Sequence, residues 1–334
     1  MSEFESLLKV AARPCVAFAV SLGNTSLRVV SDASAFGGRR FFAQRAFLAN
    51  NAPVDYEVWC IEDRNGAVRR LASGYPPDAS HRARAFAAGY YATDHFGEPV
   101  LLHRLGRRFY MVGVGLERPL WTFLVKALIF YTSLEKRQLF LKAAAVEVGG
   151  GGVLIAGRGG GGKTTLVQTL CRYGARFVTN SHAIVGDCKV IGVPTNMRVR
   201  ELDPGLEQGY PALSAGERLV DPFEHYPSTD GEPLALQRLL IVDHIPRREE
   251  GVRRLEPEHA LSFLDQFALG VNVYGLEEEM MEHCGGDFVH FGREASALRS
   301  RLQCLTEQLP CFLIRTDARD TRKHGLLLEI LGGR

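Results

Sequence analysis

The chain has 334 residues, of which 46% are hydrophobic and 23% are charged, and its formal net charge is +2. These values are typical of globular domains and exclude a disordered or fibrous chain. A charge so close to neutral gives no global basis for binding nucleic acid or an anionic membrane, so we expect neither as a partner. The length suffices for two domains, each with its own core.

Three features of the sequence favour a cytoplasmic protein. The first five residues are acidic where a secretory signal would be basic, and the most apolar stretch, 119–134, carries Lys126 at its middle. That stretch is also shorter than the roughly 20 residues that cross a bilayer. The seven cysteines lack CxxC spacing and are odd in number, which indicates free thiols in a reducing compartment.

Residues 1–116 are expected to form the smaller domain, β-rich and of α+β type. Asn65-Gly66 predicts a hairpin turn because both residues tolerate a positive φ. Residues 80–91, rich in Ala and Arg, predict an isolated helix. We find no chemical motif in this domain, and its role stays open. Apolar runs separated by Gly, Asn, Asp and Pro predict strands over residues 16–20, 27–30, 56–61, 67–71, 99–103 and 108–114.

A helix over residues 117–137 is expected to bridge the two domains. Pro119 opens it at a position where a missing N–H costs little, and apolar residues recur at helical spacing, so one face should be buried. Beyond it, strands alternate with helices over 138–334, which predicts an α/β domain with a mostly parallel sheet. The predicted strands are 140–148, 153–156, 175–179, 189–193, 239–242 and 312–315, and the helices are 163–173, 255–267, 275–283, 295–308 and 325–331.

Residues 157–164 match the phosphate-binding pattern G-x-x-x-x-G-K-[ST] without a mismatch. Glycines let backbone N–H groups converge on an anion, and the N-terminus of the following helix adds partial positive charge. An apolar strand before the pattern and a helix after it favour a phosphate-binding loop over a flexible glycine linker. We therefore predict binding of ATP or a related nucleotide with magnesium by Gly157, Arg158, Gly159, Gly160, Gly161, Gly162, Lys163, Thr164 and Thr165.

The loop and its flanks resemble the HPr kinase/phosphorylase-like family, which includes bacterial protein serine kinases and related kinases of peptide natural-product pathways. The likeness covers about residues 139–200 and rests on Ala-Ala-Ala-Val-Glu-Val at 143–148, the loop, Arg-Tyr-Gly-Ala-Arg-Phe-Val at 172–178 and Val-Pro-Thr-Asn-Met-Arg-Val-Arg at 193–200. It implies a P-loop kinase domain that phosphorylates a hydroxyl, often a serine, and whose relatives can run the reverse phosphorolysis. It also suggests a homo-oligomer.

The sequence departs from that family at one chemically important place. The strand after the loop's helix usually ends in an acidic residue, which acts as a base toward the acceptor; here Asn180 and Ser181 stand there. His182 follows and, with an unperturbed pKa near about 6.5, would suit a general base, or it is simply packed at the strand end. Asp243 closes the apolar run 239–242 in the manner of a Walker B acid that holds magnesium with Thr164, or it caps the next turn.

Several arginines and polar residues are further candidates for binding the acceptor. Arg198 and Arg200 alternate on a predicted strand and would share one face, where they could bind an acidic group or stay solvated. Arg247, just beyond Asp243, could steady transferring charge. We include Asn180 and Ser181 in the same group because both side chains form hydrogen bonds.

Two functions follow from these residues. The first is an ATP-dependent kinase that transfers the γ-phosphate to a hydroxyl of a peptide, a protein or a small metabolite, with Lys163, His182 and Asp243 in catalytic roles. The second is a nucleotide-binding sensor or scaffold that has lost activity with the aspartate at 180–181. The preference between ATP and GTP stays open.

Overall fold

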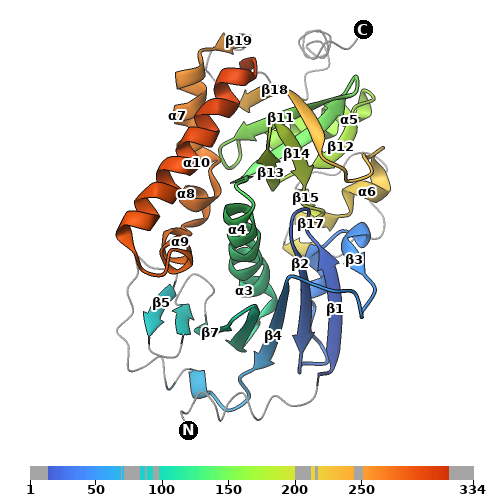
Figure 1. The fold of residues 1–334 in the computed structure, drawn as a ribbon. Coiled ribbons are helices and arrows are strands. Elements are labelled where there is room, and N and C mark those ends of the chain that lie inside the picture. Colours follow the sequence, from blue (N-terminus) through green and yellow to red (C-terminus); the bar gives the residue numbers. More distant parts are fainter. Residues whose placement is uncertain are drawn as a thin grey trace. The chain divides into compact units, whose positions relative to one another are not determined.

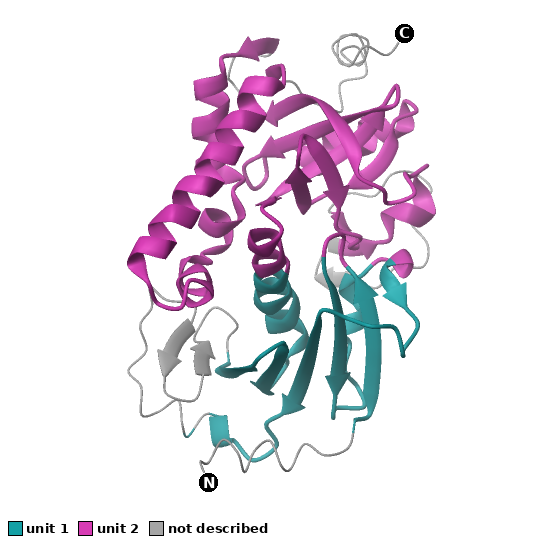
Figure 2. Ribbon diagram, in the orientation of Figure 1, with its two compact units in different colours: residues 1–21, 25–42, 46–128 teal, residues 22–24, 43–45, 129–334 magenta. Residues whose placement is uncertain are grey.

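The computed structural model describes residues 14–68, 70, 83–86, 89–92, 98–199, 212–214, 217–243 and 251–315. The chain divides into two compact units (Figure 2). Unit 1 comprises residues 1–21, 25–42 and 46–128, and unit 2 comprises residues 22–24, 43–45 and 129–334. No helix in these described ranges is long and apolar enough to cross a membrane.

The described residues of unit 1 form an eight-stranded mixed sheet in the order β3-β1-β2-β4-β8-β7-β6-β5. β4 runs parallel to its neighbours β2 and β8, and the other pairs are antiparallel. Alternate apolar residues such as Phe18, Val58 and Met111 are fully buried, as expected for strands with one face in a core. The strands are β1 (Val16–Ser21), β2 (Ser26–Ser31), β3 (Phe47–Leu48), β4 (Tyr56–Glu62), β5 (Ala83–Phe86), β6 (Gly89–Ala92), β7 (Val100–Leu105) and β8 (Arg108–Gly113).

Three local predictions in unit 1 are wrong. Asn65-Gly66 does not close a hairpin, because the carboxylate of Asp63 accepts hydrogen bonds from the backbone N–H groups of Ala67 and Val68, both at 2.9 Å. This cap starts a helical turn where residues 67–71 were predicted to be a strand. Residues 80–91 were predicted to be a helix, yet the described part of that segment forms β5 and most of β6, an antiparallel pair.

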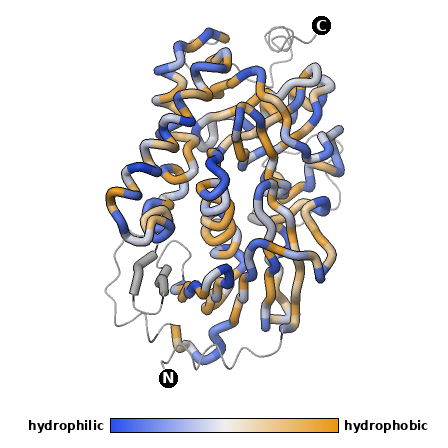
Figure 3. The backbone as a smooth tube through the Cα atoms, viewed as in Figure 1, coloured by the Kyte–Doolittle hydropathy of each residue, from blue (hydrophilic) through white to orange (hydrophobic). Residues whose placement is uncertain are grey.

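The predicted bridging helix exists as a continuous segment. It consists of α3 (Glu117–Pro119), a π-helical turn over Leu120–Leu124 and α4 (Val125–Glu135). Figure 3 shows that α4 is mostly hydrophobic, and residues 127–131 are all buried, which exceeds the single buried face that was predicted. A helix that is apolar on all sides has no surface suited to water.

In unit 2 the described strands form a nine-stranded mixed sheet, so the prediction of a mostly parallel sheet is wrong. Only the pairs β11 with β18 and β18 with β20 are parallel. The reason lies partly in Gly149 and Gly150, both with positive φ, which join β10 to β11 in the predicted turn and thereby force those two strands to be antiparallel. The strands are β9 (Leu139–Leu141), β10 (Ala143–Val148), β11 (Gly151–Gly157), β12 (Arg176–Thr179), β13 (Ala183–Gly186), β14 (Lys189–Gly192), β18 (Leu234–Val242), β19 (Gly251–Leu255) and β20 (Cys311–Arg315).

Helices cover both faces of this sheet, so the α/β class is confirmed. α5 (Lys163–Arg172) packs Leu166 and Leu170 against Ile155 and Val242. Figure 1 shows α7 (Pro257–Phe267) lying beside α10 (Phe288–Gln308) in the same unit. The other elements are α8 (Gly270–Tyr274), α9 (Glu277–His283), α6 (Pro222–His225) and a three-stranded sheet of β15 (Met197–Val199), β16 (Ala212–Ser214) and β17 (Glu217–Val220).

The boundaries of several predicted elements change. The predicted strand 140–148 is two strands, because the chain leaves the ladder at Lys142, whose backbone N–H donates to the carbonyl of Ala268. β19 was not predicted, and Leu255 belongs to it instead of to α7. α10 begins at Phe288 because the side chain of Asp287 caps it. The predicted helix 325–331 lies outside the described residues.

Candidate nucleotide site

The loop 157–164 has the local structure that its sequence predicts. β11 is buried along its whole length and delivers the chain to the loop, and α5 begins at Lys163 directly after it. Gly160 and Gly162 have φ of 76° and 94°, values that favour glycine over any other residue. Gly162 is the N-cap of α5 and accepts the N–H of Leu166 at 2.9 Å. The free N–H groups of the first turn of α5 therefore lie at the end of the loop.

Two of the loop glycines are required by close packing against β18. A Cβ atom on Gly157 would lie 2.6 Å from the carbonyl oxygen of Val242, and one on Gly161 would lie 3.1 Å from the same oxygen. Gly157 is also the register partner of Val242 in the parallel ladder. The next residue after Val242 is Asp243, so the predicted Walker B acid lies beside the loop.

Asp243 forms an ion pair with a residue of the loop itself. Its Oδ1 accepts from the Nη2 of Arg158 at 2.6 Å and from the Nε at 3.1 Å. The carboxylate is largely buried, with Asp243 only 8% exposed, whereas the side chain of Arg158 is 43% exposed, so solvent screens one partner of this ion pair. A magnesium ion at Asp243 would have to compete with this arginine.

Lys163 folds back onto the beginning of the loop. Its Nζ donates to the carbonyl oxygens of Gly157 at 2.6 Å and Arg158 at 3.0 Å. Burial and, secondarily, the positive charge of Lys142 lower the pKa of Lys163 to about 8. A bound polyphosphate would supply the opposite charge that this ammonium group lacks.

Lys142 is a site residue that the sequence reasoning missed. Ala143 pairs with Ala156 across the β10–β11 ladder, so Lys142 lies one position further, level with Gly157. The predicted turn at Gly149-Gly150 could have revealed it. A two-residue turn makes Val148 the partner of Gly151, and the same antiparallel register places position 142 opposite position 157. Two ammonium groups near one loop make an electropositive site.

Asn180 contacts the residue that is predicted to hold magnesium. Its Nδ2 donates to the Oγ1 of Thr164 at 3.2 Å and to the Oγ of Ser181 at 3.3 Å. Asn180 is 6% exposed, and its Oδ1 has no hydrogen-bond partner within the described part of the chain. Asn180 thus joins the end of β12 to the start of α5. In the kinase family that the sequence resembles, an acid usually stands at this position.

His182 lies in an aromatic cluster. Its ring stacks on Phe140 with centroids 6.0 Å apart and on Tyr274 at 5.7 Å, and the residue is only 6% exposed. The sequence allowed two roles for His182, a general base or a histidine packed at the strand end. This environment is the one expected for the packed histidine. A general base needs an imidazole nitrogen within reach of the acceptor.

Of the predicted acceptor-binding arginines, the structure describes only Arg198. Arg198 is exposed on β15, which belongs to the three-stranded sheet and not to the sheet that carries the loop. Arg200 and Arg247 lie outside the described residues.

Magnesium fits the chemistry of the site without a dedicated protein cage. The described residues contain no group of three or more His, Cys, Asp or Glu side chains able to hold a metal. Magnesium bound to a nucleotide typically takes one or two protein oxygen ligands, with phosphate oxygens and water completing the shell. Thr164 and Asp243 are residues of that type.

Comparison with known proteins adds no assignment. No protein-family model matches the chain, and no curated protein matches it.

Proposed function

We propose that this protein is a P-loop kinase that transfers the γ-phosphate of ATP, or of a related nucleoside triphosphate, to a hydroxyl group. The observation that carries the proposal is the combination of one loop with its neighbours: glycines with positive φ, Lys163 folded against Gly157, and Asp243 one strand away. Each of these groups has a defined part in phosphoryl transfer.

In this proposal the loop residues exchange partners when the nucleotide binds. Lys163 leaves the carbonyl oxygens of Gly157 and Arg158 for the β- and γ-phosphates, and the backbone N–H groups of the loop surround the same anion. Asp243 and Thr164 would hold magnesium, which would neutralise phosphate charge, and Asp243 would then release Arg158. Arg158 is then free to neutralise charge that develops on the transferred group.

Activation of the acceptor hydroxyl is the step for which the chain has the fewest suitable catalytic groups. Asn180 replaces the family's acid, and a carboxamide does not accept a proton near neutral pH. Loss of a general base typically costs about a hundredfold to ten-thousandfold in rate. Positioning and charge neutralisation supply most of the catalysis in phosphoryl transfer, so the proposed kinase works more slowly without the acid.

A second function deserves a test because of Asn180 and His182. An inactive relative of a kinase that senses nucleotide would need the loop but no base, and it would tolerate a histidine enclosed by Phe140 and Tyr274. Both functions require nucleotide binding. Only the kinase forms a phosphorylated product, and a simple NTPase would release ADP without an acceptor.

The experiment is incubation with γ-labelled ATP, magnesium and candidate hydroxyl acceptors, followed by mass spectrometry. Lys163→Ala should abolish both nucleotide binding and product. Lys189→Ala serves as the matched control, because Lys189 is an exposed lysine at the start of β14. Product formation that survives Lys163→Ala unchanged would refute the kinase assignment, and nucleotide binding without any product would favour the sensor.

A further inference from the structure

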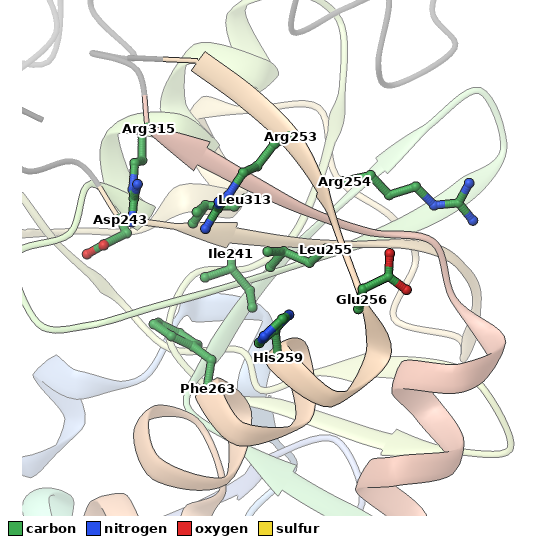
Figure 4. A pocket seen from close by; sticks show the side chains of 10 residues that line it. All are labelled: Ile241, Asp243, Arg253, Arg254, Leu255, Glu256, His259, Phe263, Leu313 and Arg315. Atoms are coloured by element: carbon green, nitrogen blue, oxygen red, sulfur yellow. The ribbon is translucent and has the colours of Figure 1, made fainter. Parts of the chain in front are cut away.

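A pocket of about 510 Å³ lies next to the loop, between α7 and the end of β18. Figure 4 shows that strands β18, β19 and β20 supply one wall, while His259 and Phe263 of α7 supply the other. Pockets that bind small molecules typically have volumes of about 300–1,000 Å³. We call this cavity the arginine pocket, after Arg253 and Arg315.

The strand registers explain how Arg253 and Arg315 are placed in the arginine pocket. Ile241, Leu313 and Arg253 are consecutive partners across β18, β20 and β19, so they form a row on one face. Two residues further along β18 and β20 come Asp243 and Arg315. The backbone N–H of Asp243 donates to the carbonyl of Ile314, the residue before Arg315, and Arg315 pairs with Gly251 of β19. The resulting second row is charged, and Gly251 adds no side chain to fill it.

Within the described part of the chain, no acidic side chain neutralises the two arginines. Neither Arg253 nor Arg315 forms an ion pair with any residue that the structure describes, and the Nε of Arg315 is buried without a hydrogen-bond partner among those residues. Buried donors normally have partners, so a vacant one that lines a cavity indicates an acceptor group on a ligand. Figure 4 shows both arginine side chains directed toward the end of the pocket at Asp243, whereas Arg254 points away.

The position of Asp243 connects the arginine pocket with phosphoryl transfer. Asp243 lines the pocket and also bonds to Arg158 in the loop. In P-loop proteins, an acid at the end of the strand beside the loop holds the magnesium that bridges the β- and γ-phosphates. The pocket therefore opens at the γ-phosphate end of the predicted nucleotide, where an acceptor must lie.

We propose that the arginine pocket binds the phosphoryl acceptor, and that the acceptor is a small hydroxylated molecule with a carboxylate or phosphate group. This inference rests on the proposed kinase function. Arg253 and Arg315 bind the acid group, Ile241, Leu313 and Phe263 contact its carbon skeleton, and the hydroxyl points toward Asp243. The hydroxyl oxygen forms a bond to the γ-phosphorus, the bond from that phosphorus to the β–γ bridging oxygen breaks with its electron pair leaving on ADP, and the hydroxyl proton passes to water.

The binding step is tested without nucleotide, by calorimetric titration with glycerate, glycerol 3-phosphate and glycerol. The first two carry the acid group, and glycerol is the neutral counterpart. We expect saturable binding of at least one acid, no binding of glycerol, and a loss of about tenfold or more in Arg253→Gln and Arg315→Gln, since each removes a charge-assisted hydrogen bond. Arg299→Gln is the matched control and should leave affinity unchanged, because Arg299 is exposed on α10 and does not line the pocket.

The same proteins are then titrated with a fluorescent ATP analogue, which reports on the loop alone. Unchanged analogue binding in Arg253→Gln and Arg315→Gln shows that the variants are folded and separates this inference from the kinase proposal. Equal binding of glycerol, no binding of either acid, or an equal loss in Arg299→Gln would overturn the acceptor pocket. A serine peptide with flanking glutamates that binds more tightly than both acids would overturn the small-molecule class.

Discussion

Glu279 offers a quantitative test of the packing of unit 2. The side chain lies on α9 and is 5% exposed, and its Oε2 has no hydrogen-bond partner within the described residues. Burial, and to a smaller extent the charges of Glu278, Glu282 and Glu277, raise its pKa from 4.5 to about 7. A carboxylate in this position is costly to ionise, so the folded protein retains the proton well above the pH at which the unfolded chain loses it.

The sign of the effect follows from proton linkage. Because the folded pKa is the higher one, the contribution of Glu279 to stability is fully present below pH 4.5 and is lost as the pH rises to about 7. The difference of roughly two and a half pKa units corresponds to about 3 kcal/mol. Glu279→Gln keeps the shape but cannot ionise. We therefore expect the variant and the natural protein to be similar at pH 4.5, and the variant to be more stable by up to about 3 kcal/mol at pH 8.

Urea unfolding at a series of pH values, followed by far-UV circular dichroism, measures this difference. Both tryptophans, Trp59 and Trp121, lie in unit 1, so their fluorescence reports on the unit without the substitution. Glu258→Gln is the control, since Glu258 is exposed on α7 of the same unit and surface substitutions usually change stability by less than about 0.5 kcal/mol. A difference between Glu279→Gln and the natural protein that stays constant from pH 4.5 to 8 would refute the reasoning.

Three predictions concern the loop. Gly157→Ala should weaken nucleotide binding by about tenfold or more, because its methyl group meets the carbonyl of Val242, whereas Gly159→Ala, with open space around it, should bind normally in the same calorimetric titration. Nucleotide affinity should be constant below about pH 8 and fall about tenfold per unit above it as Lys163 loses its proton; a flat profile to pH 9.5 would contradict the lowered pKa. Asn180→Asp should raise labelled-product formation at least about tenfold by restoring a base, and an unchanged or lower yield would count against the kinase.

The conformation of the loop 157–164 and of its flanks was predictable because the residues that define it are local. Its glycines, Lys163 and Thr164 are contiguous, and the strand and helix on either side are short enough to be recognised from their own residues. The hairpin turn at Gly149-Gly150 was predictable for the same reason.

Strand direction was not predictable from those segments, because it depends on pairing between distant residues. β18 lies between β11 and β20 only in the folded sheet, although residues 157, 242 and 314 are far apart in the chain. The two rows of the arginine pocket require the same non-local register. A sequence read segment by segment shows Arg253 and Arg315 as ordinary charged residues.

Some of the wrong predictions have a local cause in the sequence. Asn65-Gly66 favours a hairpin when these two residues are considered alone. The acid before them decides the structure, because Asp63 accepts hydrogen bonds from Ala67 and Val68 and so starts a helical turn. Asp287 starts α10 in the same way. In both places a short acid decided the structure by capping backbone N–H groups.

The pairing of Arg158 with Asp243 links the two sites more closely than the sequence suggested. The sequence reasoning assigned Arg158 to phosphate and Asp243 to magnesium as independent residues, yet one Oδ1 atom accepts both hydrogen bonds from that guanidinium. A metal that takes this oxygen would compete with Arg158 for it, so in the proposed function the binding of MgATP would favour an exchange of partners at Asp243. Because Asp243 also lines the arginine pocket, that exchange would change the charge at the end of the pocket toward which Arg253 and Arg315 point. Acceptor binding and nucleotide binding should therefore be coupled through this one carboxylate.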